Sequence, residues 1–169
     1  MTVQVGILMG SDSDWDKIKG VAKAIDEFGV EYEINVMSAH RTPNLVERYC
    51  VDAPGRGVKI IIAAAGGAAH LAGVCASHSI IPVIGIPVVT GFCGGLDSLL
   101  SVVNMPGDIA VATVGANEGG PRNAGILAVQ ILALSDDGLK QKLNVFRSGL
   151  TNKIRDKSEA LNKRIKEGK

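Results

Sequence analysis

Short apolar segments alternate with helical segments along most of the chain, and this alternation constrains the fold more than any other feature. Residues 3–9 form an apolar run that ends at Gly10 and a polar turn, a pattern typical of a buried strand. In residues 14–28 the apolar side chains recur at helical spacing, and Gly29 follows where a C-terminal cap belongs. The same reasoning predicts a strand, a helix and a strand over residues 31–37, 43–51 and 59–64.

The alternation continues in the second half of the chain. Helices are expected over residues 69–77, 96–103 and 123–134, and strands over residues 83–87 and 109–114. About five strands joined by helices predict a doubly wound α/β fold: a flavodoxin-like three-layer sandwich with a central parallel sheet. Residues 1–169 are interpreted as a single domain, with its core in residues 1–134.

The segment of residues 139–166 differs from this core. Its apolar side chains lie at helical spacing among many Lys, Arg and Glu residues, which predicts a long amphipathic helix. Such a helix follows a complete sheet, so we expect it to pack on neighbouring subunits of a homo-oligomer. The alternative is a helix that returns across its own sheet.

Composition and charge exclude several classes of function. The net charge is +1, which gives little support to nucleic-acid binding. The three cysteines form no close pair in sequence, so neither a disulfide framework nor a zinc site is indicated, and a reducing cytoplasm is the simplest location. No signal peptide or membrane span is expected, because the first residues lack a basic segment and the apolar runs are short.

Ligands of parallel sheets bind beyond the carboxyl ends of the strands, so the loops that follow the strands are the candidate sites. The first loop, residues 10–15, carries Ser11, Ser13 and Asp14 at the start of a helix, where a phosphate or ribose could dock. The alternative is that Ser11 and Asp14 form only a helix cap.

The second loop, residues 38–43, places Ser38, His40 and Arg41 together. Arg41 offers a fork of N–H donors for phosphate, and an imidazole titrates in the range useful for proton transfer near neutrality. A His-Arg pair that is merely solvated is the competing interpretation.

The third loop, residues 65–71, contains Gly66, Gly67 and Ala68, which would bring the backbone close to a ligand, followed by His70 and Leu71. A tight turn with a structural histidine is the alternative. A phosphate-binding P-loop, a nucleophile elbow, a dinucleotide fingerprint and a metal-ligand cluster are all missing from the sequence. The three loops therefore indicate proton-transfer chemistry on a small phosphorylated ligand.

Five ordered motifs make this chain resemble a known family. They are Gly-Ser-Asp-Ser-Asp-Trp at residues 10–15, Ser-Ala-His-Arg-Thr-Pro at 38–43, Ala-Gly-Gly-Ala-Ala-His-Leu at 65–71, Pro-Val-Ile-Gly-Ile-Pro-Val at 82–88, and Gly-Leu-Asp-Ser-Leu-Leu-Ser-Val-Val-Asn-Met-Pro at 95–106. The chain resembles the 5-(carboxyamino)imidazole ribonucleotide mutases, also called the catalytic subunit of phosphoribosylaminoimidazole carboxylase. The resemblance extends to about residue 134.

This resemblance implies a flavodoxin-like subunit of a homo-octamer with active sites at subunit junctions, acting in purine biosynthesis on a ribonucleotide without metal or organic cofactor. His40 matches the catalytic histidine. The remaining matched positions are substrate-binding ones: Ser11, Ser13, Asp14, Ser38, Arg41, Gly66, Gly67, Ala68, His70 and Leu71.

Three departures from the family pattern leave alternatives open. Ala72 replaces a proline, and residues 90–94 and 117–122 differ from the family's loops and are expected to border the pocket. One alternative is direct carboxylation of aminoimidazole ribonucleotide by carbon dioxide, although the Gly66–His70 run favours the mutase. The others are a carboxylating enzyme for another ring and a non-catalytic nucleotide- or flavin-binding module. A flavin site is disfavoured, because the chain has one Trp, two Tyr and three Phe for stacking.

Overall fold

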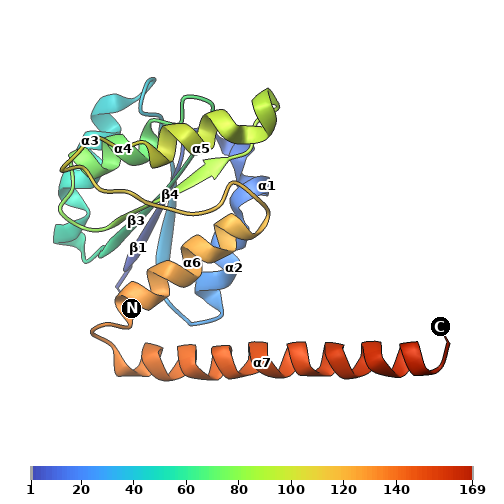
Figure 1. Ribbon diagram of the computed structural model, residues 1–169. Coiled ribbons are helices and arrows are strands. Elements are labelled where there is room, and N and C mark those ends of the chain that lie inside the picture. Colours follow the sequence, from blue (N-terminus) through green and yellow to red (C-terminus); the bar gives the residue numbers. More distant parts are fainter. Residues whose placement is uncertain (1, 169) are drawn as a thin grey trace. The chain divides into compact units, whose positions relative to one another are not determined.

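The computed structural model describes residues 2–168, and its central element is a five-stranded, all-parallel sheet (Figure 1). The strand order is β2-β1-β3-β4-β5. The strands are β1 (Val5–Met9), β2 (Tyr32–Val36), β3 (Ile60–Gly66), β4 (Val83–Val88) and β5 (Ala112–Thr113). The helices are α1 (Trp15–Ile18), α2 (Gly20–Asp26), α3 (Pro43–Asp52), α4 (Leu71–Ser77), α5 (Leu96–Val103), α6 (Gly119–Leu132) and α7 (Asp137–Lys166), and 3-10 turns span Asp12–Asp14, Pro54–Arg56 and Phe92–Gly95. This order confirms the predicted flavodoxin-like sheet.

The central strands lack the alternation of polar and apolar residues because both faces of the sheet are covered. Every residue of β1 and β4 is buried, and so is every residue of β3 except its last. Figure 1 shows α3, α4 and α5 on one face and α1, α2 and α6 on the other. The core beneath the first group includes Val46 of α3, Ile61 of β3 and Val102 of α5.

The chain consists of two compact units. The described residues up to Ile131 form the first, which holds the whole sheet, and those from Leu132 on form the second, which holds α7. The predicted long helix is confirmed as α7. It begins at Asp137, two residues before the predicted start, and Asp136 caps it, because the Asp136 side chain accepts the N–H of Leu139 at 2.9 Å.

Several elements differ from their predicted extents. The helix expected over residues 123–134 is α6, which begins at Gly119 and ends at Leu132. The helix expected over residues 14–28 is divided into α1 and α2 by a turn at Lys19, and the cap at Gly29 is confirmed by its φ of 69°. The strand expected over residues 109–114 is reduced to β5, whose two residues pair only with Ile84 and Gly85 of β4.

Candidate active site

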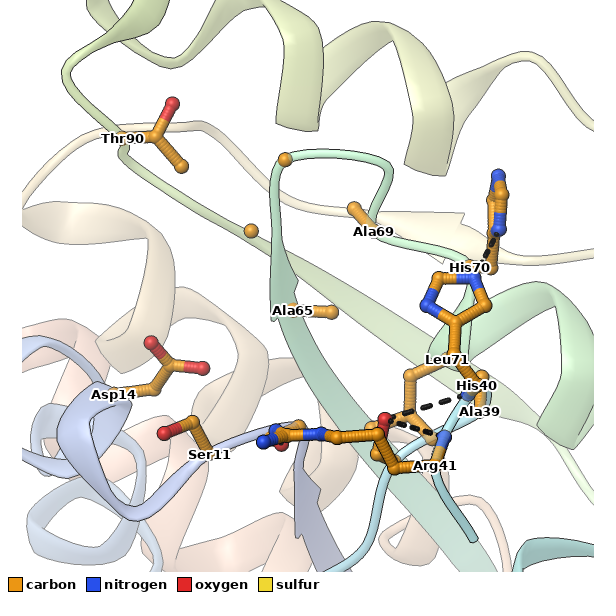
Figure 2. A pocket seen from close by; sticks show the side chains of 14 residues that line it. Ser11, Asp14, Ala39, His40, Arg41, Ala65, Ala69, His70, Leu71 and Thr90 are labelled. Atoms are coloured by element: carbon orange, nitrogen blue, oxygen red, sulfur yellow. Dashed lines mark hydrogen bonds between the residues drawn. The ribbon is translucent and has the colours of Figure 1, made fainter. Parts of the chain in front are cut away.

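A cavity of about 500 Å³ lies at the carboxyl ends of β1, β2 and β3 and brings all three predicted loops together. Figure 2 shows that the side chains from these loops surround it. The lining residues are Gly10, Ser11, Asp14, Ser38, Ala39, His40, Arg41, Ala65, Gly66, Gly67, Ala69, His70, Leu71 and Thr90. The convergence follows from topology, because β1 lies between β2 and β3 and all three strands run in the same direction.

The loop after β1 contributes a hydroxyl and a carboxyl. Ser11 Oγ lies 2.8 Å from Ser13 Oγ and accepts the Ser13 N–H at 3.3 Å, so Ser11 caps the turn as the capping interpretation predicted. Ser11 nevertheless lines the cavity together with Asp14. Burial raises the pKa of the Asp14 carboxyl above its usual range, and Lys17 opposes this shift. Ser13 is not among the lining residues.

The loop after β2 is held in shape by its own hydroxyl groups. Ser38 Oγ accepts the N–H groups of His40 at 3.3 Å and of Arg41 at 3.2 Å. The Ser38 N–H donates to Thr42 Oγ1 at 2.9 Å, and that hydroxyl donates back to the Ser38 carbonyl at 3.1 Å. Ser38 therefore both lines the cavity and fixes the backbone from which His40 and Arg41 project.

Arg41 reaches across the cavity floor to the first loop. Its Nη2 donates to the Gly10 carbonyl at 2.7 Å. In Figure 2 the guanidinium extends toward Ser11, while His40 and His70 lie at the other end of the cavity. The cavity thus has one end suited to an anion and hydroxyl groups and another end that carries imidazoles.

His40 and His70 form a direct pair. His40 Nε2 lies 2.7 Å from His70 Nδ1, and the two rings meet edge to face at an interplanar angle of 81°. One of the two nitrogens must carry the proton that the other accepts. The pair therefore links the loops after β2 and β3 and provides groups that can donate and accept protons.

The loop after β3 turns through two residues with left-handed backbone conformations. Gly67 has a φ of 68° and Ala69 a φ of 43°. A left-handed conformation is easily adopted by glycine but is unfavourable for alanine, so the surroundings must hold Ala69 in place. This turn points His70 toward His40, whereas Ala68 is not among the lining residues.

Sequence reasoning did not identify Thr90 as a site residue, although the loop of residues 90–94 was expected to border the pocket. Thr90 lines the cavity from the end of β4, and Ala39, Ala65, Ala69 and Gly10 contribute backbone and small side chains. The other departing loop lies elsewhere: Asn117, Glu118 and Pro121 line a second cavity with Lys17 and Val89. The expectation that residues 117–122 border the active-site cavity is therefore not met.

Within the described residues 2–168, the structure offers neither a metal-binding cluster nor a membrane-spanning helix. There is no group of three or more His, Cys, Asp and Glu side chains arranged to hold a metal ion. None of the described helices combines the length and the apolar character needed to cross a bilayer.

Comparison with known proteins gives consistent matches over most of the chain. The N5-carboxyaminoimidazole ribonucleotide mutase of Vibrio vulnificus is 51% identical over 152 residues, which cover 90% of this chain and 94% of that protein. The protein of the same name from Bacillus subtilis is 47% identical over 157 residues, covering 93% and 97%.

Structural comparison agrees with the sequence matches. The crystal structure of Treponema denticola PurE superposes with a TM-score of 0.86 at 29% identity, covering 94% of this chain and 98% of that chain. The family model described as AIR carboxylase matches residues 4–153, a range that includes every residue of the cavity. The chain therefore belongs to the AIR carboxylase family.

Proposed function

We propose that this chain interconverts 5-(carboxyamino)imidazole ribonucleotide and 4-carboxy-5-aminoimidazole ribonucleotide in purine biosynthesis. It is an isomerase, a mutase that moves a carboxyl group from nitrogen to carbon. The observation that carries this conclusion is the 51% identity over 152 residues to a protein named as that mutase. The geometry of the cavity supports it by providing an anion-binding end and a proton-transfer end.

The ribonucleotide binds with its phosphate and ribose toward Arg41, Ser11 and Asp14. The Arg41 guanidinium uses Nη2 for the Gly10 carbonyl, and its other N–H donors are directed to the phosphate. The Ser11 hydroxyl and the Asp14 carboxyl line the same end of the cavity as the Arg41 guanidinium, and they suit the hydroxyl groups of the ribose. In this orientation the imidazole ring of the substrate reaches the end of the cavity that carries His40 and His70.

The reaction then proceeds by loss and recapture of carbon dioxide. The carbamate C–N bond breaks, its electron pair returns to the exocyclic nitrogen, and that nitrogen takes a proton from His40. The adjacent ring carbon, an enamine-like nucleophile, attacks the trapped carbon dioxide and forms the new C–C bond. His40 removes the hydrogen from that carbon, which restores the aromatic ring and returns the proton that it gave.

The cavity walls and His70 complete this cycle. Holding carbon dioxide against the ring makes the second step effectively unimolecular, and the backbone of Gly66 and Gly67 forms the wall that confines it. His70 lies within hydrogen-bond distance of His40, so a proton can pass between the two rings while His40 changes from donor to acceptor.

We further propose that the functional form is a homo-oligomer in the cytoplasm, and that it is the octamer implied by the resemblance to the family. Charge distribution supports self-association: residues 1–131 carry eight Lys and Arg against twelve Asp and Glu, whereas residues 132–169 carry ten against five. The basic α7 also exposes apolar side chains, including Leu150, Ile154 and Leu161. A helix with these two properties suits the acidic surface of a neighbouring copy.

The test is an ultraviolet assay for 4-carboxy-5-aminoimidazole ribonucleotide with two starting materials. The first is freshly made carbamate substrate at low carbon dioxide, and the second is aminoimidazole ribonucleotide with excess bicarbonate. We expect faster conversion of the carbamate. Product from the second mixture alone would instead make the chain a direct carboxylase, which is the alternative that the departures at Ala72 and Thr90 raise. If neither mixture gave product, the remaining interpretations would be an enzyme that acts on another ring substrate and a non-catalytic binding module.

A further inference from the structure

Among the described residues, Ser98 alone is both polar and fully buried, and no step of the proposed reaction uses it. It lies in the first half of α5, and its exposed fraction is 0%. Its Oγ accepts the backbone N–H of Gly67 at 2.9 Å. The contact therefore joins α5 to the turn after β3, across 31 residues of sequence.

The Ser98 hydroxyl is in turn held by a carboxylate. Ser98 Oγ donates to Asp97 Oδ1 at 3.5 Å, and Thr90 Oγ1 donates to both oxygens of Asp97, at 3.0 and 3.2 Å. A hydroxyl that donates to a carboxylate is a better acceptor for a further N–H group. The network therefore runs from Gly67 through Ser98 and Asp97 to Thr90, and both of its ends line the cavity.

The turn held by this network has little freedom elsewhere. A β-carbon added to Gly66 would meet Thr90 Cγ2 at 3.0 Å and the Val88 carbonyl oxygen at 3.2 Å, so the turn is closely packed against the end of β4. Ala69 has its unfavourable φ of 43° two residues after Gly67. His70, which pairs with His40, follows directly.

We infer that Ser98 is a positioning residue for the carboxyl-transfer reaction, because its hydroxyl holds the Gly67 amide and thereby the turn that confines carbon dioxide and carries His70. This inference rests on the proposed function. Ser98 does not touch the substrate, and it acts by fixing Gly67, Ala69 and His70. Loss of the hydroxyl leaves the Gly67 N–H without its partner and allows the turn to move.

The main experiment compares the Ser98→Ala variant with the wild-type chain on carbamate substrate. We expect kcat to fall about 10- to 100-fold, because small displacements of reacting groups have effects of this size. The KM should change little, since Arg41, Ser11 and Asp14 lie on other loops. A larger share of each turnover should also end as released aminoimidazole ribonucleotide instead of carboxylated product.

The ratio of released to carboxylated product separates positioning from damage to the fold. A smaller fraction of folded enzyme lowers both products equally and leaves their ratio unchanged. Thr113→Val is the matched control, because Thr113 Oγ1 donates to the Val102 carbonyl of the same helix at 3.3 Å, away from the cavity turn. Asp97→Asn keeps the Ser98 hydroxyl, so it should raise the ratio of released to carboxylated product by a smaller amount than Ser98→Ala. It is the variant to measure if Ser98→Ala does not fold.

Hydrogen exchange at the Gly67 amide gives a second measurement that does not need turnover. We expect about tenfold faster exchange in Ser98→Ala and no change in Thr113→Val. An unchanged product ratio together with unchanged exchange would overturn the inference while leaving the proposed function intact. A wild-type chain that does not convert the carbamate would overturn the proposed function, and exchange would still decide whether Ser98 holds the turn.

Discussion

At the scale of single residues, the contact between His40 and His70 joins two loops that are 30 residues apart in sequence. His40 projects from a loop whose backbone is fixed by Ser38, and His70 follows the turn that is held by Ser98. Each imidazole is thus positioned by a serine hydroxyl that accepts backbone N–H groups. Proton transfer depends on such fixed positions, since a catalytic group must lie within hydrogen-bond reach of its proton.

We predict that His40→Asn retains nucleotide binding within a few fold but loses turnover by about 10²- to 10⁴-fold, the usual contribution of a general acid or base. The asparagine amide keeps polar character but cannot act as a general acid or base near neutral pH. Turnover is followed by the ultraviolet assay and binding by calorimetry. His78→Asn is the matched control, because His78 lies outside the cavity, 3.9 Å from Glu47. Near-normal turnover in the His40 variant would remove His40 from the mechanism.

A second residue-scale prediction concerns Asp14. Burial raises the pKa of its carboxyl in the folded chain, so the folded state carries an unfavourable charge at neutral pH. For an acid with a raised folded pKa, stability decreases as the pH rises through that pKa, and below the unfolded pKa the penalty is absent. Asp14→Asn should therefore raise the melting temperature at pH 7, and this gain should shrink as the pH falls toward 4.

The same variant separates stability from function, because it should weaken nucleotide binding while it stabilises the fold. Thermal melts at several pH values check the first effect and calorimetry the second. Asp16→Asn is the control. Lys19 lowers the pKa of the exposed Asp16 carboxyl, which is the opposite direction to the shift at Asp14, so no rise in melting temperature at pH 7 is expected. A gain for Asp14→Asn that persisted at low pH would contradict the explanation.

Sequence reasoning predicted most of the polar residues that line the cavity after β1, β2 and β3, and it missed those that depend on packing. Ser11, His40 and His70 could be predicted because parallel strands end at one edge of the sheet, so the loops after neighbouring strands converge. Ser98 and Thr90 could not, because their contacts with the Gly66–Gly67 turn arise from the way α5 and the end of β4 pack beside β3. No local pattern encodes those contacts.

At the scale of the elements, the close approach of α2 and α6 determines what these helices tolerate. A β-carbon added to Gly125 of α6 would meet the Val21 carbonyl oxygen at 2.7 Å and Ala24 Cβ at 2.8 Å. Arg122 of α6 also forms a two-pronged ion pair with Glu27, with N···O distances of 2.7 and 2.8 Å. The first turn of α2 also lies near α6, because a β-carbon added to Gly20 would meet the Arg122 backbone nitrogen at 3.6 Å and Pro121 Cβ at 3.7 Å, which is ordinary van der Waals contact.

We predict that Gly125→Ala destabilises the fold despite alanine's higher helix propensity. Overpacking against α2 costs about 1–3 kcal/mol, and the gain in propensity is about 1 kcal/mol. Asn123→Ala is the control, since Asn123 is exposed on the same helix and should gain a few tenths of a kcal/mol. Urea denaturation measures both. Equal effects of the two substitutions on the unfolding midpoint would contradict the packing argument.

At the scale of the whole molecule, α7 presents an apolar stripe that runs along most of its length. The stripe consists of Leu139, Leu143, Phe146, Leu150, Ile154, Leu161 and Ile165, which recur at intervals of three, four or seven residues. Its members from Leu150 onward are 38–65% exposed. Water-exposed apolar side chains in such a row mark an interaction surface, and the proposed oligomer assigns it to a neighbouring copy.

The corresponding prediction is that Leu150→Glu combined with Ile154→Glu dissociates the oligomer while the sheet remains folded. Two charges on the stripe cannot be buried without a large desolvation cost. Asn152→Glu, on the opposite face of α7, adds one charge without affecting the stripe and should leave the assembly intact. Sedimentation velocity gives the mass, and the far-ultraviolet circular dichroism spectrum checks the fold. If the stripe variant sedimented like the wild-type chain, α7 would not be the surface that joins the copies, and the oligomer would have to form through another face of the α/β unit.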